Sequence, residues 1–315
     1  MTLVSIITPS YNQANFLEQT IRSVLTQDYG PVEYMIIDGG STDGSLEIIQ
    51  NYSDQLAWWV SERDEGQADA INKGFAQARG EIVAWLNSDD LYLPGAIKQA
   101  ATALAENPDL GLVFGDAITI DSQDNKLNDL VFQDWQLMDL LCYRIICQPA
   151  VFMRRTMLEQ AGYLDLNYHY MLDHQLWLRI AQRAPIKHIS STLAAARHHP
   201  GAKNVDQAAG FGEEALRLLQ WLQDQPEFAP LVASNRRNVE AGAYRLNARY
   251  LLDGDQPGPA LQSYGRALVR NPPFTLQHWH RMVYALLSLV GGKGLAGWYY
   301  RIRSRLRKGN NPLAT

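Results

Sequence analysis

The first 106 residues alternate between two patterns of hydrophobic and polar positions. Short apolar runs without polar alternation are typical of strands buried on both faces of a sheet. The segments between them have apolar residues three and four positions apart, which predicts amphipathic helices. The predicted strands are 3–8, 32–38, 56–61 and 82–86, and the predicted helices are 16–27, 45–52, 68–78 and 96–106. This alternation indicates right-handed βαβ units and a mostly parallel, Rossmann-like sheet flanked by helices.

The pattern becomes helical in the last third of the chain. Before that point we expect a strand over 112–120, a polar connection over 123–133 and a helix over 175–183. Beyond Asn204 the predicted helices are 213–223, 235–252, 259–270 and 274–290. The run AGAYRLNARYLLDGDQPGPALQSYGRALVRNP resembles one tetratricopeptide helix pair. We therefore expect an α/β domain at 1–205 and a helical extension, partly tetratricopeptide-like, at 206–315.

Composition and charge narrow the function classes. With 46% hydrophobic and 19% charged residues, the chain can bury a sizeable core and is not a disordered protein. Residues 236–315 carry 13 Lys and Arg against 3 Asp and Glu, a net +10, whereas the preceding 235 residues are acidic. A basic region attracts anionic membrane, acidic partners or nucleic acid. No nucleic-acid-binding motif accompanies it, so we expect no nucleic acid and favour membrane or a partner protein.

The C-terminal segment combines interfacial aromatic residues with cations. Trp298, Tyr299 and Tyr300 precede Arg301, Arg303, Arg305, Arg307 and Lys308. This combination predicts a peripheral membrane contact through a basic amphipathic C-terminus. The alternative is a solvated basic helix that packs on the acidic part of the chain. The longest apolar run is far below the ~20 residues that span a bilayer.

The chain start and the cysteines indicate a cytoplasmic protein. The N-terminus lacks the basic, apolar and small-residue pattern of a signal peptide. Cys142 and Cys147 are too few and wrongly spaced for a zinc site, and we expect packed thiols in a reducing compartment.

Two adjacent carboxylates, Asp89 and Asp90, follow the predicted strand 82–86. The ends of such strands lie at the rim of an open α/β sheet, where ligands usually bind. A divalent cation that also holds a diphosphate offsets the repulsion between two carboxylates. The alternative is that both residues form a polar turn and cap the helix that begins near Pro94.

Polar residues also follow the other predicted strands, at the same rim of the sheet. These are Ser10 to Asn12, Asp38 and Glu62 to Asp64. A nucleotide fits across such a rim.

Four ordered motifs carry a family resemblance. VSIITPSYNQ, IIDGGSTDG, SERDEGQADAINKG and GEIVAWLNSDDLYLPG resemble a family 2 glycosyltransferase with the GT-A fold. The resemblance is closest to the bacterial branch that builds O-antigen and capsule polysaccharides, and it covers roughly the first 200 residues. It implies an inverting transfer of a sugar from a nucleoside diphosphate sugar, usually a uridine one, to the hydroxyl of a glycan or lipid-linked glycan. It also implies Mn²⁺ or Mg²⁺ as cofactor.

The resemblance assigns roles to individual residues. Pro9 and Tyr11 fall where the family holds the base, with the Tyr11 ring available for stacking. Asp38 falls where the ring N–H of the base is read. Asp90 corresponds to the metal-binding carboxylate of the DXD motif, and Asp89 to the neighbour that contacts ribose or metal.

The loop 62–66 and the following helix complete the expected nucleotide site, with Asp64, Asn72 and Lys73 as contacts. Asp69 and Asn72 share one helix face and can reach the sugar or the base. The alternative is an ordinary solvated helix surface.

Two positions depart from the pattern of many relatives. Gly39 stands where they have a second acidic residue, and Ile71 stands where they have an arginine. Lys73 or Arg63 can supply the missing positive charge.

A second constellation lies in YMLDHQLWLR, residues 170–179. The family commonly has Glu-Asp here, with the Asp as catalytic base; Leu172 replaces the Glu and Asp173 is retained. An inverting transfer needs one carboxylate to take the acceptor proton as the hydroxyl attacks. Asp173 suits that role, and the alternative is an N-cap of the helix 175–183.

The remaining expected contacts follow from the resemblance. Gln148 and Trp177 are assigned to the acceptor side. His199, in the sequence RHHPG, falls near the metal or diphosphate, and the alternative is a surface histidine. Arg197 or Lys203 can offset the diphosphate charge.

Two other functions stay open on the sequence. A sugar nucleotidyltransferase needs a glycine-rich, basic loop after its first strand, and PSYNQ differs from such a loop. An inactive transferase-like scaffold that acts through its helical extension is favoured by Leu172 in place of Glu and by Asn87 in place of Asp.

Overall fold

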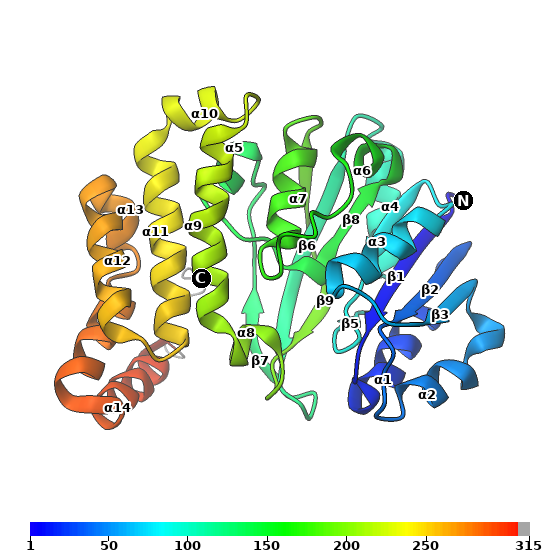
Figure 1. Ribbon diagram of the computed structural model, residues 1–315, viewed down its shortest axis with the longest axis horizontal. Helices are drawn as coiled ribbons and strands as arrows, with labels where there is room; N and C mark the ends of the chain where they lie inside the picture. Colours follow the sequence, from blue (N-terminus) through cyan, green and yellow to red (C-terminus); the bar gives the residue numbers. More distant parts are fainter. Residues whose placement is uncertain (308–315) are drawn as a thin grey trace. The chain divides into compact units, whose positions relative to one another are not determined.

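The computed structural model describes the backbone of residues 1–307. Within it, side chains are described outside 204–205, 291–293, 295–296 and 300–307. The cations expected to contact a membrane, from Arg301 onward, therefore lie outside the described side chains. The chain forms two compact units, shown in Figure 1. The α/β unit comprises Met1–Leu140 and Ile145–His199, and the helical unit comprises Leu141–Arg144 and Pro200–Thr315.

The first half of the α/β unit consists of alternating strands and helices. The strands are β1 (Val4–Ser10), β2 (Val32–Asp38), β3 (Trp58–Ser61) and β4 (Ile82–Trp85). They alternate with α1 (Ala14–Leu25), α2 (Ser45–Asn51), the short 3₁₀ turn η1 (Ser53–Gln55) and α3 (Gln67–Gln77). All four strands are parallel, in the order β3-β2-β1-β4. This confirms the parallel βαβ arrangement expected from the hydrophobic pattern.

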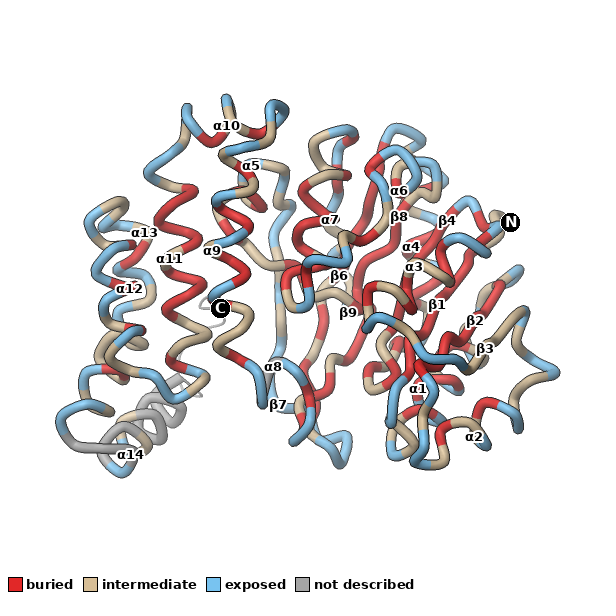
Figure 2. The backbone as a smooth tube through the Cα atoms, viewed as in Figure 1, coloured by how far each residue is buried: buried red, intermediate tan, exposed pale blue. Residues whose placement is uncertain are grey.

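The second half of this unit extends the same sheet with mixed strand directions. Its elements are β5 (Leu91–Tyr92), α4 (Ala96–Glu106), β6 (Leu112–Ile120), β7 (Lys126–Leu130), α5 (Leu137–Leu141), η2 (Gln148–Ala150), β8 (Val151–Arg154), α6 (Arg155–Ala161), α7 (Leu172–Ala181) and β9 (Ile186–Arg197). The sheet order continues β4-β8-β6-β9-β5, and β7 pairs with β6. Strand β8 is antiparallel to both neighbours, whereas β6 and β9 are parallel. Figure 2 shows that buried positions concentrate on the central strands.

Three predicted elements differ from the observed ones. The connection expected over 123–133 contains β7, whose mostly exposed residues carry no apolar pattern. Helix α7 begins three residues before the expected start at 175, because the buried Leu172 already belongs to its apolar face. The helix expected over 274–290 is divided into α13 (Pro272–Leu276) and α14 (Trp279–Arg307). A tight turn from the Thr275 carbonyl to the His278 N–H separates them.

The helical unit is built around one long central helix. Besides α13 and α14, its helices are α8 (Lys203–Asp206), α9 (Ala208–Asp224), α10 (Ala229–Ser234), α11 (Arg236–Asp253) and α12 (Pro257–Arg270). Helix α11 packs against both α9 and α12. The segment Leu141–Arg144 is held in this unit by a hydrogen bond from the Tyr143 hydroxyl to the Ala215 carbonyl at 2.9 Å. None of the described helices combines the length and the apolarity that a bilayer crossing requires.

We expect an alanine at Gly242 to destabilise the helical unit. A Cβ atom there would lie 2.2 Å from the carbonyl oxygen of Cys142, so the backbone of α11 or of the segment Leu141–Arg144 has to shift. Such overpacking lowers the free energy of unfolding by about 1–3 kcal/mol. Gly265, in α12, is the matched control, because a Cβ there meets no atom within 4 Å. Gly265→Ala should instead raise the stability by about 0.5–1 kcal/mol.

Urea unfolding of the two alanine variants measures both changes. Equal effects of Gly242→Ala and Gly265→Ala would contradict the close approach of α11 to residue 142.

Candidate active site

The carboxyl ends of the four parallel strands lie side by side at one rim of the sheet. In the strand register, Ser10 is opposite Asp38, and Asp38 is opposite Ser61. Strand β4 pairs with β1 on the other side and ends just before Asn87 to Asp90. The polar loops that follow these strands are therefore neighbours, as the parallel arrangement predicts.

Asp38 is fully buried and organises the loop that follows β2. Its Oδ2 atom accepts hydrogen bonds from the N–H groups of Gly40 and Ser41 at 3.1 and 2.9 Å, and from the Ser61 hydroxyl at 2.7 Å. Its Oδ1 atom accepts a bond from the Ser41 hydroxyl at 2.5 Å. The carboxylate expected to read the base thus holds the loop that follows β2.

Tyr11, Gly39 and Asp64 meet in one small patch of the rim. The Tyr11 side chain is 63% exposed, so its ring is accessible, whereas Pro9 is buried in β1. A Cβ atom at Gly39 would lie 2.7 Å from Asp64 Oδ2 and 3.3 Å from Tyr11 Cδ2. Asp64 Oδ1 is fixed by the N–H of Gly66 at 2.9 Å. The Asp64 carboxylate therefore occupies the space that an acidic side chain at position 39 would enter, which explains the glycine there.

The two predicted contacts on α3 have partners within the protein. The Asn72 amide donates to the carbonyl of Leu164 at 2.8 Å and accepts from its N–H at 2.9 Å. Lys73 forms ion pairs with Glu62 at 2.8 Å and with Asp69 at 3.4 Å. In this geometry Asn72 fixes the backbone near Leu164, and the charge of Lys73 is neutralised by neighbouring carboxylates.

The acidic pair after β4 is tightly enclosed. Asp90 is 5% exposed; its Oδ1 atom accepts from the N–H of Arg197 at 2.9 Å and its Oδ2 atom from the Asn87 amide at 3.1 Å. Burial, followed by the negative charge of Asp89, raises the pKa of Asp90 to about 8. A carboxyl group with so high a pKa lies where added positive charge would be strongly stabilising.

His199 pairs with Asp89. Its Nε2 atom lies 3.1 Å from Asp89 Oδ2, and its ring packs on Phe16 with 4.5 Å between ring centroids. The His199 side chain is nearly buried, so it is not the surface histidine of the alternative interpretation.

Arg197, at the end of β9, fixes the acidic turn. Its guanidinium group donates to the carbonyl of Asp89 at 2.8 Å, to the carbonyl of Asp121 at 3.0 Å and to the side chain of Asp124 at 2.6 Å. It also donates to Gln19 at 2.9 Å, and its side chain is completely buried. These partners occupy the guanidinium, so Arg197 positions the turn and does not offer its charge to a diphosphate.

A network of amides connects Asp90 to the expected acceptor side. Asn87 donates to Gln148 Oε1 at 3.1 Å and accepts from Gln67 at 2.8 Å, and Gln148 donates to the Trp85 carbonyl at 2.8 Å. Because Asn87 acts here as both donor and acceptor, an aspartate at this position could not make the same set of bonds. The sequence did not predict that Gln67 belongs to this network, because a polar residue at the start of a helix is common and matches no motif.

Asp173 lies in the first turn of α7, and Met171 is the N-cap residue of that helix. The N-cap alternative is therefore wrong. Asp173 Oδ1 accepts the N–H of His174 at 2.6 Å. Burial raises the pKa of the Cys147 thiol, and the negative charges of Asp90 and Asp173 raise it further.

Trp177 belongs to the core behind the site. It is 1% exposed and stacks on Trp85 of β4, with 5.1 Å between ring centroids and 28° between ring planes. In this position it presents no surface to an acceptor. Instead the stacked pair attaches α7 to the strand whose end carries the acidic turn, and so holds Asp173 in place.

The side chains near the acidic turn can hold a cation only if a bound ligand, such as a diphosphate, supplies further oxygen atoms. Among the described residues, no group of three or more His, Cys, Asp and Glu side chains could hold a metal ion. Asp89 and His199 do converge and supply one oxygen and one nitrogen donor. Mg²⁺ and similar cations are often held by one or two carboxylates plus substrate phosphates. The residues therefore fit a cation that shares its coordination shell with a diphosphate.

Comparisons with known proteins identify the relatives of this chain. Residues 5–160 match the model of the family described as "Glycosyl transferase family 2". An uncharacterized glycosyltransferase of Nostoc sp. is 30% identical over 227 residues, which is 68% of this chain and 70% of the relative. One of Rickettsia conorii is 31% identical over 218 residues, which is 65% of this chain and only 36% of the relative. The chain thus spans about a third of that longer protein.

A solved structure shares the fold. The crystal structure of S. aureus TarS 1-349 in complex with UDP aligns with 98% of this chain and 92% of its own length, with a TM-score of 0.62 and 18% sequence identity. This likeness confirms the expected GT-A-like α/β fold with a C-terminal helical part.

Proposed function

The chain belongs to glycosyl transferase family 2, and we propose that it transfers a sugar with inversion from a nucleoside diphosphate sugar to an acceptor hydroxyl. The donor nucleotide is UDP, and the acceptor is a glycan or lipid-linked glycan in bacterial surface polysaccharide synthesis. The observation that carries the proposal is the acidic turn that follows β4, with α7, the helix of Asp173, packed on the same strand through the stacked Trp85 and Trp177.

The rim offers a suitable surface for the nucleotide. The exposed ring of Tyr11 can stack on the base, and the neighbouring Asp64 carboxylate can accept a ring N–H. The loop held by Asp38 supports the same surface. TarS, a protein of the same fold, has been solved in complex with UDP, which supports the proposal of a uridine nucleotide as donor.

The proposed reaction is a single displacement. The acceptor hydroxyl gives its proton to the Asp173 carboxylate while its oxygen bonds to the anomeric carbon. The bond between that carbon and the phosphate oxygen breaks, and its electron pair leaves with the diphosphate. Mn²⁺ or Mg²⁺ would be held by Asp89 and His199 together with the diphosphate, beside the carboxylate of Asp90, and would stabilise the negative charge of the leaving diphosphate. Gln148, one hydrogen bond away from Asn87, lies next to this turn on the side proposed for the acceptor.

Calorimetric titration with UDP, GDP and TDP tests the donor assignment. We expect UDP to bind most tightly in the presence of Mn²⁺ or Mg²⁺, because cation and diphosphate complete each other's coordination. Removal of the cation with EDTA should weaken UDP binding at least about tenfold, since charge-assisted contacts are lost. The absence of nucleotide binding under every metal condition would contradict the proposed function and favour an inactive scaffold.

A further inference from the structure

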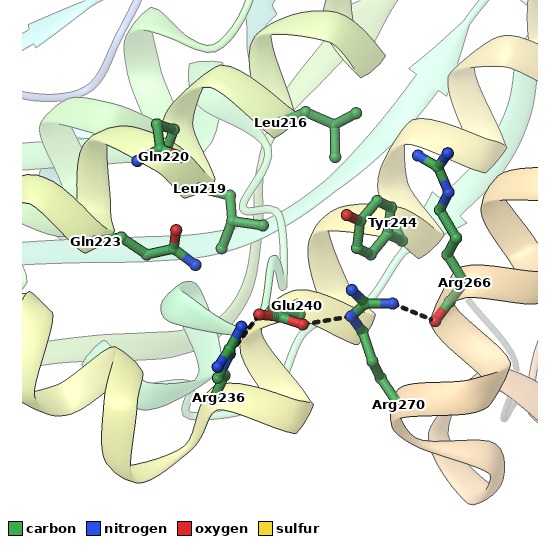
Figure 3. Close-up of a pocket in the computed structure, with 9 residues that line it drawn as sticks. All are labelled: Leu216, Leu219, Gln220, Gln223, Arg236, Glu240, Tyr244, Arg266 and Arg270. Atoms are coloured by element: carbon green, nitrogen blue, oxygen red, sulfur yellow. Dashed lines mark hydrogen bonds and ion pairs between the residues drawn. The ribbon is translucent and has the colours of Figure 1, made fainter.

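The helical unit contains a cavity of about 300 Å³ among α9, α11 and α12 (Figure 3). Helix α9 contributes Leu216, Leu219 and two glutamines to its wall. Helix α11 contributes Arg236, Glu240 and Tyr244, and α12 contributes two more arginines. All of these residues belong to the helical unit, so this unit alone forms the cavity.

The cavity wall carries an excess of positive charge. Its lining includes three guanidinium groups, from Arg236, Arg266 and Arg270, and a single carboxylate, that of Glu240. Burial raises the pKa of Glu240, but the hydrogen bonds from Arg236 and Arg270 outweigh it and leave the pKa below its usual value. Glu240 is therefore ionised at neutral pH, and the lining residues carry a net charge of about +2.

Glu240 holds two of the guanidinium groups in fixed positions. Arg236 Nε donates to Glu240 Oε1 at 2.7 Å, and Arg270 Nε donates to Glu240 Oε2. Arg270 Nη1 also donates to the carbonyl of Arg266 at 3.1 Å. Because Nε is the atom used toward Glu240 in both cases, the Nη atoms of Arg236 and Nη2 of Arg270 are not the atoms that these two hydrogen bonds use.

The ring of Tyr244 orders the arginines of α12. The guanidinium carbons of Arg270 and Arg266 lie 4.4 and 5.7 Å from the ring centroid. The side chain of Arg270 is 28% exposed and that of Arg236 is 72% exposed, so solvent and solutes reach both. Ordered guanidinium groups lose less conformational entropy when they bind a ligand.

We propose that this cavity binds an oxoanion, either phosphate or carboxylate, carried by a saccharide unit. Guanidinium groups recognise both anions through paired N–H donors. On the opposite wall, Gln220 and Gln223 offer amide donors and acceptors suited to sugar hydroxyls, next to the apolar Leu219. A volume near 300 Å³ is at the small end of the range for ligand pockets and suits about one sugar residue.

The source of this ligand follows from the proposed function. If the protein transfers sugars to a glycan, the anionic saccharide is a unit of its acceptor, bound by the helical unit at a place separate from the reacting hydroxyl. This assignment to the acceptor rests on the proposed function, whereas binding of the anionic sugar itself does not.

Calorimetric titrations of the full chain test the site with four probes: glucose 6-phosphate, glucuronate, inorganic phosphate and glucose. We expect one of the two anionic sugars to bind at least about tenfold more tightly than glucose, and more tightly than inorganic phosphate. The tighter of the two identifies the oxoanion. Binding should weaken as salt increases. Equal binding of inorganic phosphate and the anionic sugars would overturn the recognition of a saccharide, and no binding of either sugar would overturn the site.

Two variants locate the binding. Arg266→Gln and Arg236→Gln should each weaken anionic-sugar binding at least about tenfold. Arg266→Gln leaves the contacts of Glu240 with Arg236 and Arg270 intact, so it separates ligand binding from folding. Arg217→Gln, on α9 but outside the cavity wall, is the matched control and should bind the sugar as the unmodified protein does. Unchanged affinity in both cavity variants would place the sugar elsewhere.

A UDP titration of the same samples, with Mn²⁺ and with EDTA, separates this inference from the proposed function, because only cation-dependent UDP binding reports on the proposed donor site. UDP binding without anionic-sugar binding would contradict the cavity site alone, whereas anionic-sugar binding without UDP binding would contradict the proposed function alone. Arg266→Gln should leave UDP affinity unchanged.

Discussion

Replacing Asp173 with asparagine is expected to lower the rate of sugar transfer by about 10²–10⁴-fold, the contribution typical of a general base. Asparagine has nearly the same shape, and its side-chain oxygen can still accept the 2.6 Å hydrogen bond from the N–H of His174. The first turn of α7 should therefore keep its structure. What is lost is the carboxylate that takes the acceptor proton. Transfer is measured as release of UDP from UDP-sugar with acceptor present.

Three further measurements make this result specific to Asp173. UDP binding to Asp173→Asn should remain within about twofold of the unmodified protein, because the base acts on the acceptor and not on the nucleotide. Asp109→Asn, an exposed carboxylate of the same unit, is the matched control and should transfer at the normal rate. Asp173→Glu should recover part of the activity, since it restores a carboxylate. Normal transfer by Asp173→Asn would remove Asp173 from the reaction.

The parallel half of the sheet was predictable because its signals are local. Each of its strands is a short apolar run, and each helix shows its own periodicity within a dozen residues. The second half depends on contacts between distant segments, such as the pairing of β6 with both β8 and β9. Strand β7 shows the limit clearly: with four of its five residues exposed, it forms no hydrophobic pattern.

The sequence predicted which side chains belong to the candidate site, but not which hydrogen bonds they form with one another. The ends of the strands place Asp38, Asp89 and Asp90 at one rim, which follows from strand order alone. The pairing of His199 with Asp89 joins residues 110 positions apart, and no local pattern encodes it. The same holds for Asn72, whose amide is held by the backbone of Leu164, 92 positions away. The sequence therefore identifies side chains such as His199 and Asn72 as candidate ligand contacts. Only their hydrogen-bond partners in the structure show whether they bind a ligand or position the backbone.

The structure explains why position 39 is a glycine, where many relatives have an acidic residue. In the sequence it is the loss of an acidic residue. In the structure, the Asp64 carboxylate lies 2.7 Å from where a side chain at position 39 would begin. The negative charge at this point of the rim is therefore supplied from the loop after β3. Because β2 and β3 are adjacent and in register, a residue of one loop can replace a residue of the other.

Replacing Asp90 with asparagine should lower transfer by about 10²–10³-fold, the effect typical of removing one group that stabilises charge in the transition state. Cation-dependent UDP binding should weaken at least about tenfold in the same variant. The physical reason is charge at a buried position: Asp90 is 5% exposed, and only as a carboxylate can it balance a cation beside Asp89. Transfer assays and UDP calorimetry with and without EDTA measure the two effects. Asp28→Asn, whose side chain is 92% exposed, is the control for the loss of one negative charge.

A double substitution separates charge from hydrogen bonding at this position. In Asp90→Asn one side-chain oxygen has to replace two. If it keeps the N–H of Arg197, the new NH₂ group meets the Asn87 amide, two donors where the native pair has a donor and an acceptor at 3.1 Å. Asn87→Asp combined with Asp90→Asn restores a donor and an acceptor between the two residues but moves the carboxylate to position 87. Asn87→Asp alone measures the cost of losing the hydrogen bond from Asn87 to Gln148 Oε1. If Asp90 acts through its charge, the double variant stays as inactive as Asp90→Asn. Recovery of transfer in the double variant would instead show that Asp90 acts by holding the turn together.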